Sequence, residues 1–352
     1  MKNTNFSYVI ILLLLAGNLC FPQQQKLNVY GFFDVEAIVS NKDAAGKRWS
    51  FDQHHLNFLL NYQLDDRFRV ATEIDYEHGP VFSSAEITGK IYVGKAFLEY
   101  KYSDALLARI GIFLSPFGIY NERHDATPTF LFTFLPHSVY NKRELSFGVK
   151  GRLFAKQSTG IQVLGNLFAN DWGVKYQIYL SNGRGPKESG EDNNTNKGLG
   201  WRIVISPPIE ELHIGTSFYS DKNGNVYNAR QTTLGFDFEY DLSDAHIEAE
   251  IIIPKLENVD TSGTPNGSFT YVNGYYLLGA YTFFNRLTPF ARYEFFDPDL
   301  DVNNNGEKIT VFGINFAITS SVYLKGEVHF HRFQDPNIKK YEMFVSSIAA
   351  AF

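Results

Sequence analysis

The C-terminal segment 340–352 alternates residue by residue between two faces, up to the final residue Phe352. The same period of two recurs along the whole chain and is clearest over 67–77. There the charged side chains of Arg69, Glu73 and Asp75 alternate with apolar neighbours such as Val70 and Ile74. Successive side chains of a strand point to opposite faces, so this pattern predicts an all-β fold of amphipathic strands. We find no amphipathic helix pattern of about 12 residues or more.

The connections between the expected strands alternate between short and long. Short ones include 64–66, 103–104, 242–244, 285–286 and 319–321, and long polar ones include 41–48, 78–89, 182–198, 221–229, 256–269 and 297–307. Short turns at one end and long loops at the other are typical of transmembrane β-barrels. The terminal Phe352 on a final amphipathic strand also resembles the C-terminal signature of bacterial outer-membrane β-barrels.

The number of strands has to be even if both ends of the chain lie on the same side of the membrane. The alternating segments number seventeen, and counting from each end places the conflict between 146 and 168. We therefore expect one bent strand over about 146–168, interrupted by a bulge near Gln157–Gly160, and a barrel of sixteen strands. An additional strand within 128–140, giving eighteen, is the alternative.

The N-terminus has the features of a secretory signal. Lys2 precedes the apolar run Val9–Leu15, which is too short to span a bilayer. We expect a signal peptide over 1–24 and a barrel domain over 25–352. The only cysteine, Cys20, then leaves with the signal, so the mature chain would contain no disulfide.

The composition agrees with a barrel. Aromatic residues make up 16% of the chain, yet the mean hydropathy is slightly negative at -0.21. This combination suits a wall that is apolar outside and polar inside, with polar loops.

Segment 115–145 is the longest interruption of the alternating pattern. Long loops without regular structure are usually functional. This one is rich in proline and phenylalanine, so we expect it to fold into the lumen as a constriction loop or to cover a contact between protomers. Its candidate residues are Pro116, Phe117, Gly118, Phe130, Phe132 and Phe134.

The stretch Arg109–Gly118 (RIGIFLSPFG) resembles the R-x-G-x-F-x-x-P-F-G motif of the phosphate-selective (O and P type) porins. Arg143-Glu144 followed by 148–151, and Asp192–Asn194 followed by Lys197 and Arg202, are similar to two further stretches of that family. The resemblance covers 109–202 and implies a homotrimer of sixteen-stranded barrels that conducts phosphate or another small oxyanion.

Charge is unevenly distributed. The whole chain has a formal charge of -6, but 87–156 contains ten basic and five acidic residues. A cluster of Arg and Lys at a constriction favours anions, because a low-dielectric wall focuses their field. The candidate pore-lining and selectivity residues are Lys95, Lys101, Arg109, Arg123, Lys142, Arg143, Lys150 and Arg152.

We therefore expect an outer-membrane porin that is not an enzyme and has no cofactor. Its partners would be outer-membrane lipid, lipopolysaccharide and small anions rather than nucleic acid. A substrate-specific channel for organic acids or sugars, and an outer-membrane lipid hydrolase, are the alternatives. No metal site is expected, because no cluster of carboxylates or cysteines completes the pairs His54-His55 and His329/His331, and 297–306 departs from a calcium loop at Phe312.

Overall fold

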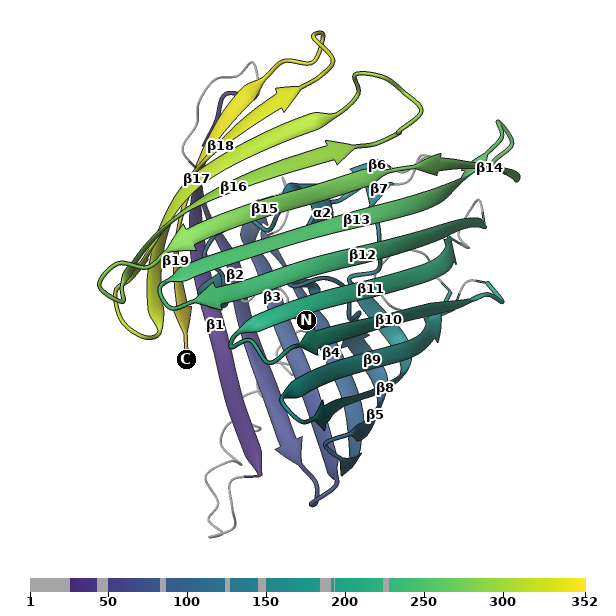
Figure 1. Cartoon of the computed structure of the whole chain (residues 1–352), viewed down its shortest axis with the longest axis vertical. Coiled ribbons are helices and arrows are strands. Elements are labelled where there is room, and N and C mark those ends of the chain that lie inside the picture. The colour runs from purple at the N-terminus through teal and green to yellow at the C-terminus, as the bar shows by residue number, and fades with distance from the viewer. Residues whose placement is uncertain are drawn as a thin grey trace, which may run out of the picture.

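The computed structural model describes residues 26–42, 50–82, 87–123, 127–144, 150–183, 191–192, 194–223 and 228–352. The expected signal peptide over 1–24 lies outside these residues. All but two short strands of the described chain form one antiparallel sheet, which closes on itself because β1 (Leu27–Ser40) pairs with both β2 (Ser50–Gln63) and β19 (Tyr341–Ala351). Figure 1 shows the strands tilted around a common interior.

The wall of the described chain has sixteen strands, as the alternation predicts. Strands β14 and β15 both pair with β13 and are two parts of one wall strand, interrupted at Val272. The wall consists of β1 (Leu27–Ser40), β2 (Ser50–Gln63), β3 (Phe68–Phe82), β4 (Ile87–Ser103), β5 (Leu106–Leu114), β8 (Gln157–Ala169), β9 (Trp172–Asn182), β10 (Lys197–Ser206), β11 (Leu212–Asn223), β12 (Ala229–Leu242), β13 (Ala245–Val259), β14 (Pro265–Tyr271), β15 (Asn273–Tyr281), β16 (Leu287–Asp297), β17 (Glu307–Ala317), β18 (Val322–Phe333) and β19 (Tyr341–Ala351).

The predicted long strand over 146–168 is wrong for the described residues 150–156, whereas 146–149 lie outside the described residues. The wall strand β8 begins only at Gln157, where it pairs with Leu114 of β5. Of the preceding residues, Lys150–Gly151 form β7, which pairs only with β6 (Arg143–Glu144) in a separate two-stranded sheet. The alternative of a wall strand within 128–140 is also wrong, because that region contains the short helix α2 (His137–Tyr140) and irregular backbone.

The wall places polar side chains inside and apolar side chains outside. In β3, Glu73 and Asp75 are buried, whereas Val70 and Ile74 are 39% and 38% exposed. The same alternation exposes leucines, isoleucines and phenylalanines on the other strands, for example Ile161, Leu277 and Phe312. An apolar outer belt around a closed antiparallel barrel is the arrangement required to cross a bilayer with strands. Within the described residues, no helix is long and apolar enough to span a membrane.

The two ends of the barrel differ. One end has tight turns, such as Asp104-Ala105, Asn170-Asp171 and Ser243-Asp244, and we call it the turn side. The other, the loop side, carries the longer connections. Two of the predicted long loops, 78–89 and 256–269, are instead mostly strand, because β3 pairs with β4 out to Phe82 and β13 pairs with β14 out to Val259.

The barrel closes where Phe352 meets the first strand. Its backbone N–H donates to the oxygen of Gly31 at 2.9 Å, and the N–H of Gly31 donates to the oxygen of Phe352 at 2.8 Å. The Phe352 ring covers the site where Gly31 has no side chain, and it contacts Phe58 edge-on at 5.9 Å between ring centroids. The terminal aromatic ring therefore joins the last strand to β1 and β2.

We predict that Phe352→Ala destabilises this junction by about 1 kcal/mol, the usual value of an aromatic pair. Phe352→Tyr, which keeps the ring, is the matched control and should unfold like the wild type. Urea unfolding in detergent micelles, followed by tryptophan fluorescence, measures the difference. Equal midpoints for the alanine and tyrosine variants would contradict the role of the ring.

Candidate functional site

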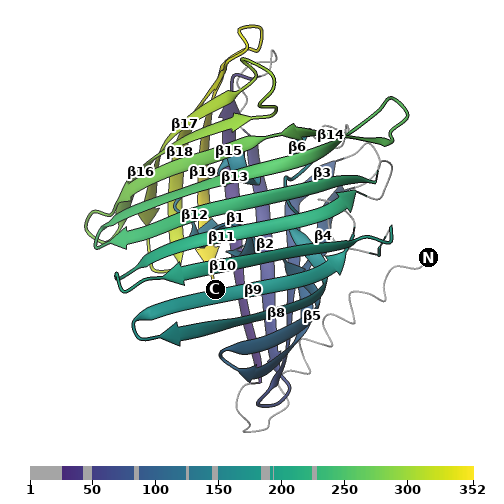
Figure 2. The ribbon, with the colours of Figure 1, turned by 45° about the vertical axis from the view of Figure 1, so that its right-hand side comes forward.

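The barrel interior is crossed by the connection between β5 and β8. We call its described residues, 115–123, 127–144 and 150–156, the inner segment. Phe117, Phe130, Phe132 and Phe154 are almost fully buried, and Phe117 stacks on Phe154 with ring centroids 4.0 Å apart. Figure 2 shows the ring of strands that surrounds this interior. The described residues of this segment therefore pack against one another inside the ring of strands.

The inner segment docks on a row of buried acids. Four glutamates of the wall, on β13, β16 and β18, point into the lumen. Each accepts a hydrogen bond from a residue of the inner segment. The Tyr140 hydroxyl donates to Glu250 at 2.7 Å, and the backbone N–H of Ser138 donates to Glu294 at 2.9 Å. The other two pairs are Tyr120 to Glu248 and the backbone N–H of Thr133 to Glu327.

Two wall side chains bind carbonyl groups of the same segment. Asn315 on β17 donates to the carbonyls of Phe130 and Leu131 at 3.1 and 3.2 Å. The buried Lys325 on β18 donates to the carbonyl of Phe132 at 3.0 Å and also to that of Thr127. The segment therefore satisfies buried donors and acceptors of the wall, and leaving either unpaired would be costly.

Both tyrosines remain donors over the physiological range. Burial and the carboxylates of Glu248 and Glu239 raise the pKa of Tyr120 well above its usual value. Burial and Glu250 do the same for the pKa of Tyr140. The phenol protons are therefore available to the acids at neutral pH.

Gly118 occupies a position that only glycine fits. Its φ of +62° lies in the left-handed region, and its N–H donates to the Ser217 hydroxyl at 3.1 Å. A Cβ there would overlap the carboxylate of Glu250 and the hydroxyl of Tyr140. The glycine of the Pro-Phe-Gly stretch is thus explained by its close approach to the wall.

A cavity of about 840 Å³ opens toward the loop side between the inner segment and strands β1, β2, β18 and β19. We call it the loop-side cavity. Five basic side chains line it, Lys42, Lys142, Arg143, Arg152 and Lys156, together with two acidic ones, Glu77 and Glu307. The cavity wall therefore has a basic surplus, although the chain as a whole is acidic.

Of three smaller cavities that open toward the turn side, two are lined by the inner segment. One, of about 530 Å³, is lined by Arg286, Asn315 and Tyr323, and shares Phe130 with the loop-side cavity. The other, of about 380 Å³, is lined by equal numbers of basic and acidic groups. The inner segment therefore lines both of these cavities as well as the loop-side cavity.

The structure brings together three of the eight predicted selectivity residues, Lys142, Arg143 and Arg152, which line the loop-side cavity. Lys150 is described only through its backbone in β7. The remaining four predicted residues do not line this cavity. Each forms an ion pair with an acidic side chain, with nitrogen–oxygen distances of 2.6–3.0 Å. Their partners are Glu73 for Lys95, Asp104 for Lys101, Glu99 for Arg109 and Glu239 for Arg123.

Sequence reasoning missed Lys42 and Lys156 as cavity residues. Lys42 follows the end of β1 by two positions, and nothing in the local pattern shows that β1 ends beside this cavity. Lys156 immediately precedes β8, in the region interpreted as a continuous wall strand. A sequence signal was available there, because Leu153-Phe154-Ala155 interrupts the alternation and all three residues are buried.

No protein-family model matches this chain, and no curated protein matches it in sequence. Solved structures do match. They include an anion-selective porin from Comamonas acidovorans (12% identity, TM-score 0.65, covering 93% of this chain and 99% of that one). Another is OmpF of Salmonella typhi in complex with daunomycin (11% identity, TM-score 0.63, covering 93% of this chain and 97% of that one). A third is the outer-membrane channel DcaP of Acinetobacter baumannii (13% identity, TM-score 0.60, covering 93% of this chain and 97% of that one).

These similarities show a shared fold. The apolar outer belt, the polar interior and the sixteen antiparallel strands have the physical basis already given. The molecule is therefore a multi-pass β-barrel of the bacterial outer membrane.

We predict that Gly118→Ala releases the inner segment from the wall, because the added Cβ meets Glu250 and Tyr140. Limited proteolysis of the folded barrel should then cleave within 115–156 faster than in the wild type. Gly267→Ala is the matched control, since Gly267 also has a positive φ (+80°) but nothing lies within 4 Å of an added Cβ. Equal cleavage of both variants would contradict the role of the close contact at Gly118.

His137 makes docking dependent on pH. Its ring lies 6.0 and 5.7 Å from those of His329 and His331 on β18. Desolvation, those two histidines and the cations Arg143 and Arg292 lower the pKa of His137 well below 6.5. Glutamates also pack around this helix: Glu294 binds Ser138, and Glu307 binds both Arg143 and His331. Folding therefore favours a neutral His137.

The sign of the effect follows. Above pH 6.5 the unfolded chain also holds this histidine neutral, so nothing is lost. Below pH 6.5 only the unfolded form takes up the proton, and stability falls by about 1.4 kcal/mol per pH unit until the folded pKa is reached. We predict that His137→Asn reduces the loss of urea resistance between pH 7.5 and 5.5. An unchanged loss in the variant would assign the acid sensitivity to other groups.

Proposed function

We propose that this chain is a passive diffusion channel of the outer membrane that prefers small anions of the phosphate type. The basic surplus of the loop-side cavity is the observation that carries the proposal. A cavity with low-dielectric walls concentrates counter-ions of opposite charge. Lys142 and Arg152 are the residues we assign to this attraction, with Lys42, Arg143 and Lys156 beside them.

The comparisons support the proposal in two respects. One protein of the same fold is described as an anion-selective porin, and another, OmpT of Vibrio cholerae, is described in a trimer form. We therefore propose a homotrimer in contact with outer-membrane lipid and lipopolysaccharide. The resemblance of Arg109–Gly118 to phosphate-selective porins points to the same class of solute.

Passive transport requires no reaction at the barrel. The described Ser206 hydroxyl does contact Nδ1 of His213 at 2.8 Å, which is one element of a hydrolase site. Both residues line a turn-side cavity rather than the lipid-facing surface, and no hydrogen bond or ion pair joins His213 to a carboxylate among the described residues. This geometry favours a channel over the lipid-hydrolase alternative.

We predict that the double variant Lys142→Glu/Arg152→Glu lowers the anion-to-cation permeability ratio by roughly tenfold, because it reverses the charge of the cavity wall. Reversal potentials of single channels in planar bilayers under a potassium chloride gradient measure this ratio. The matched control is Lys339→Glu/Lys340→Glu, which changes the same charge on exposed residues outside the cavity. A wild-type channel selective for cations, or equal shifts in both variants, would refute the assignment.

A channel specific for organic anions is the second candidate, because aromatic residues also line the loop-side cavity. They are Phe130, Phe134, Tyr140, Phe333 and Tyr341. An organic carboxylate could pack its apolar part on these rings while the basic groups bind its charge. Block of the chloride current by benzoate at concentrations at which phosphate has no effect would favour this candidate. The opposite order would favour phosphate.

A further inference from the structure

Strand β2 contains a bulge at its two consecutive histidines. In the pairing of β1 with β2, Asp34 lies opposite His55 and the next residue, Val35, lies opposite Gln53. His54 is therefore an extra residue on β2. Consecutive side chains of a regular strand point to opposite faces, but a bulge lets two of them face one partner. Both rings line the loop-side cavity, with centroids 3.8 Å apart.

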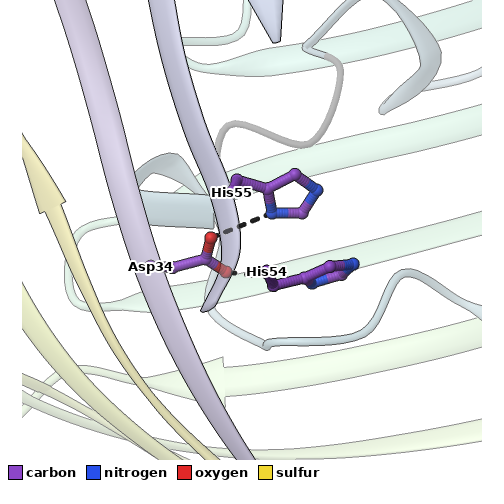
Figure 3. Close-up of side chains that lie close together, drawn as sticks. All are labelled: Asp34, His54 and His55. Carbon is purple, nitrogen blue, oxygen red and sulfur yellow. Dashed lines mark hydrogen bonds and ion pairs between the residues drawn. The ribbon is translucent and has the colours of Figure 1, made fainter. Parts of the chain in front are cut away.

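Two carboxylates of β1 face these rings. Nδ1 of His55 lies 2.9 Å from Oδ1 of Asp34, and Nδ1 of His54 lies 2.6 Å from Oε1 of Glu36. The second oxygen of Asp34 lies 4.0 Å from Nδ1 of His54. Figure 3 shows Asp34 directed at both histidines. The expectation that no carboxylate joins this histidine pair is therefore wrong, because the sheet supplies it from another strand.

We propose that Asp34, His54 and His55, with Glu36 as a fourth ligand, bind a zinc-class divalent metal ion. One ligand atom from each of the first three residues lies within 4.8 Å of the others. Two imidazole nitrogens and two carboxylate oxygens are a donor set that Zn²⁺ accepts in tetrahedral geometry. The ion would replace the present hydrogen bonds between these groups.

Burial supports a cation at this position. Asp34 and Glu36 are 0% and 2% exposed, and Oδ2 of Asp34 accepts no hydrogen bond from any described residue. A buried carboxylate oxygen without such a partner is costly unless a cation compensates it. On the other side of β1, the strand β19 places the uncharged Ala349 and Ser347 opposite Asp34 and Glu36.

The nearby lysine does not take this role directly. Lys325 on β18 interacts electrostatically with Asp34 and Glu36. Its ammonium group, however, donates hydrogen bonds to the carbonyls of Thr127 and Phe132 in the inner segment. A metal ion could reach the acids through the loop-side cavity. Oε1 of Glu77 lies 4.0 Å from Nε2 of His55, the ring nitrogen that would not bind the metal. Glu77 is therefore placed to orient the His55 ring.

The test uses the full barrel, purified without a polyhistidine tag and treated with EDTA. Zn²⁺ is titrated against a chromophoric chelator. We expect one equivalent bound per chain, and an affinity at least tenfold lower in both His55→Gln and Asp34→Asn. His213→Gln, a histidine on β11 outside the cluster, is the matched control and should bind like the wild type. Heat-modifiable gel mobility checks that each variant is folded.

X-ray absorption at the zinc edge gives a readout that needs no variant. Zinc-loaded wild-type barrel should show scattering from two imidazoles. A second described group, Glu239, His246 and Glu248, could also hold a metal ion. Absence of stoichiometric binding, a spectrum with fewer than two imidazoles, or loss of binding in His246→Gln but not in His55→Gln would overturn the proposal. None of these measurements depends on ion conduction, so the metal site and the channel function can fail separately.

Discussion

The hydrogen bonds between the lumen-facing acids and the inner segment are the interaction on which the interior depends. The period of two in each wall strand forces every second side chain inward, and on β13, β16 and β18 several of these are glutamates. Once the interior is filled, such groups cannot remain without partners, because a buried unpaired carboxylate is very unfavourable. The inner segment supplies the donors, through the hydroxyls of Tyr120 and Tyr140 and the backbone of Ser138 and Thr133.

This docking also explains how an acidic chain can present a basic cavity. Glu248, Glu250, Glu294 and Glu327 are covered by the inner segment and do not line the loop-side cavity. The basic residues that the segment itself contributes, Lys142, Arg143, Arg152 and Lys156, are left facing that cavity. Net charge of the chain is therefore a poor guide to selectivity in such a barrel. What matters is which charges the crossing segment covers and which it exposes.

Alternation along one strand could be predicted from the sequence, and relations between strands could not. The two faces of β3 were predictable because each position depends only on its neighbours. The region before Gln157 was misinterpreted because residues packed in the lumen can alternate like residues of a wall, here with Gly151 and Leu153 buried on either side of the half-buried Arg152. Likewise, the alternation placed Arg109 on the lumen face, but its partner Glu99 comes from the pairing of β4 with β5.

The cluster of Asp34, His54 and His55 is the clearest example of a relation between strands that the sequence alone could not predict. In a regular strand, His54 and His55 would face opposite sides of the wall, so the sequence indicates at most one ligand. A single extra residue in β2 changes this, and the change is visible only in the register between β1 and β2. The acids complete the argument, because Asp34 and Glu36 are two positions apart on β1 and must share a face. A bulge opposite two buried acids thus concentrates four metal-binding groups where the linear pattern suggests a pair of unrelated histidines.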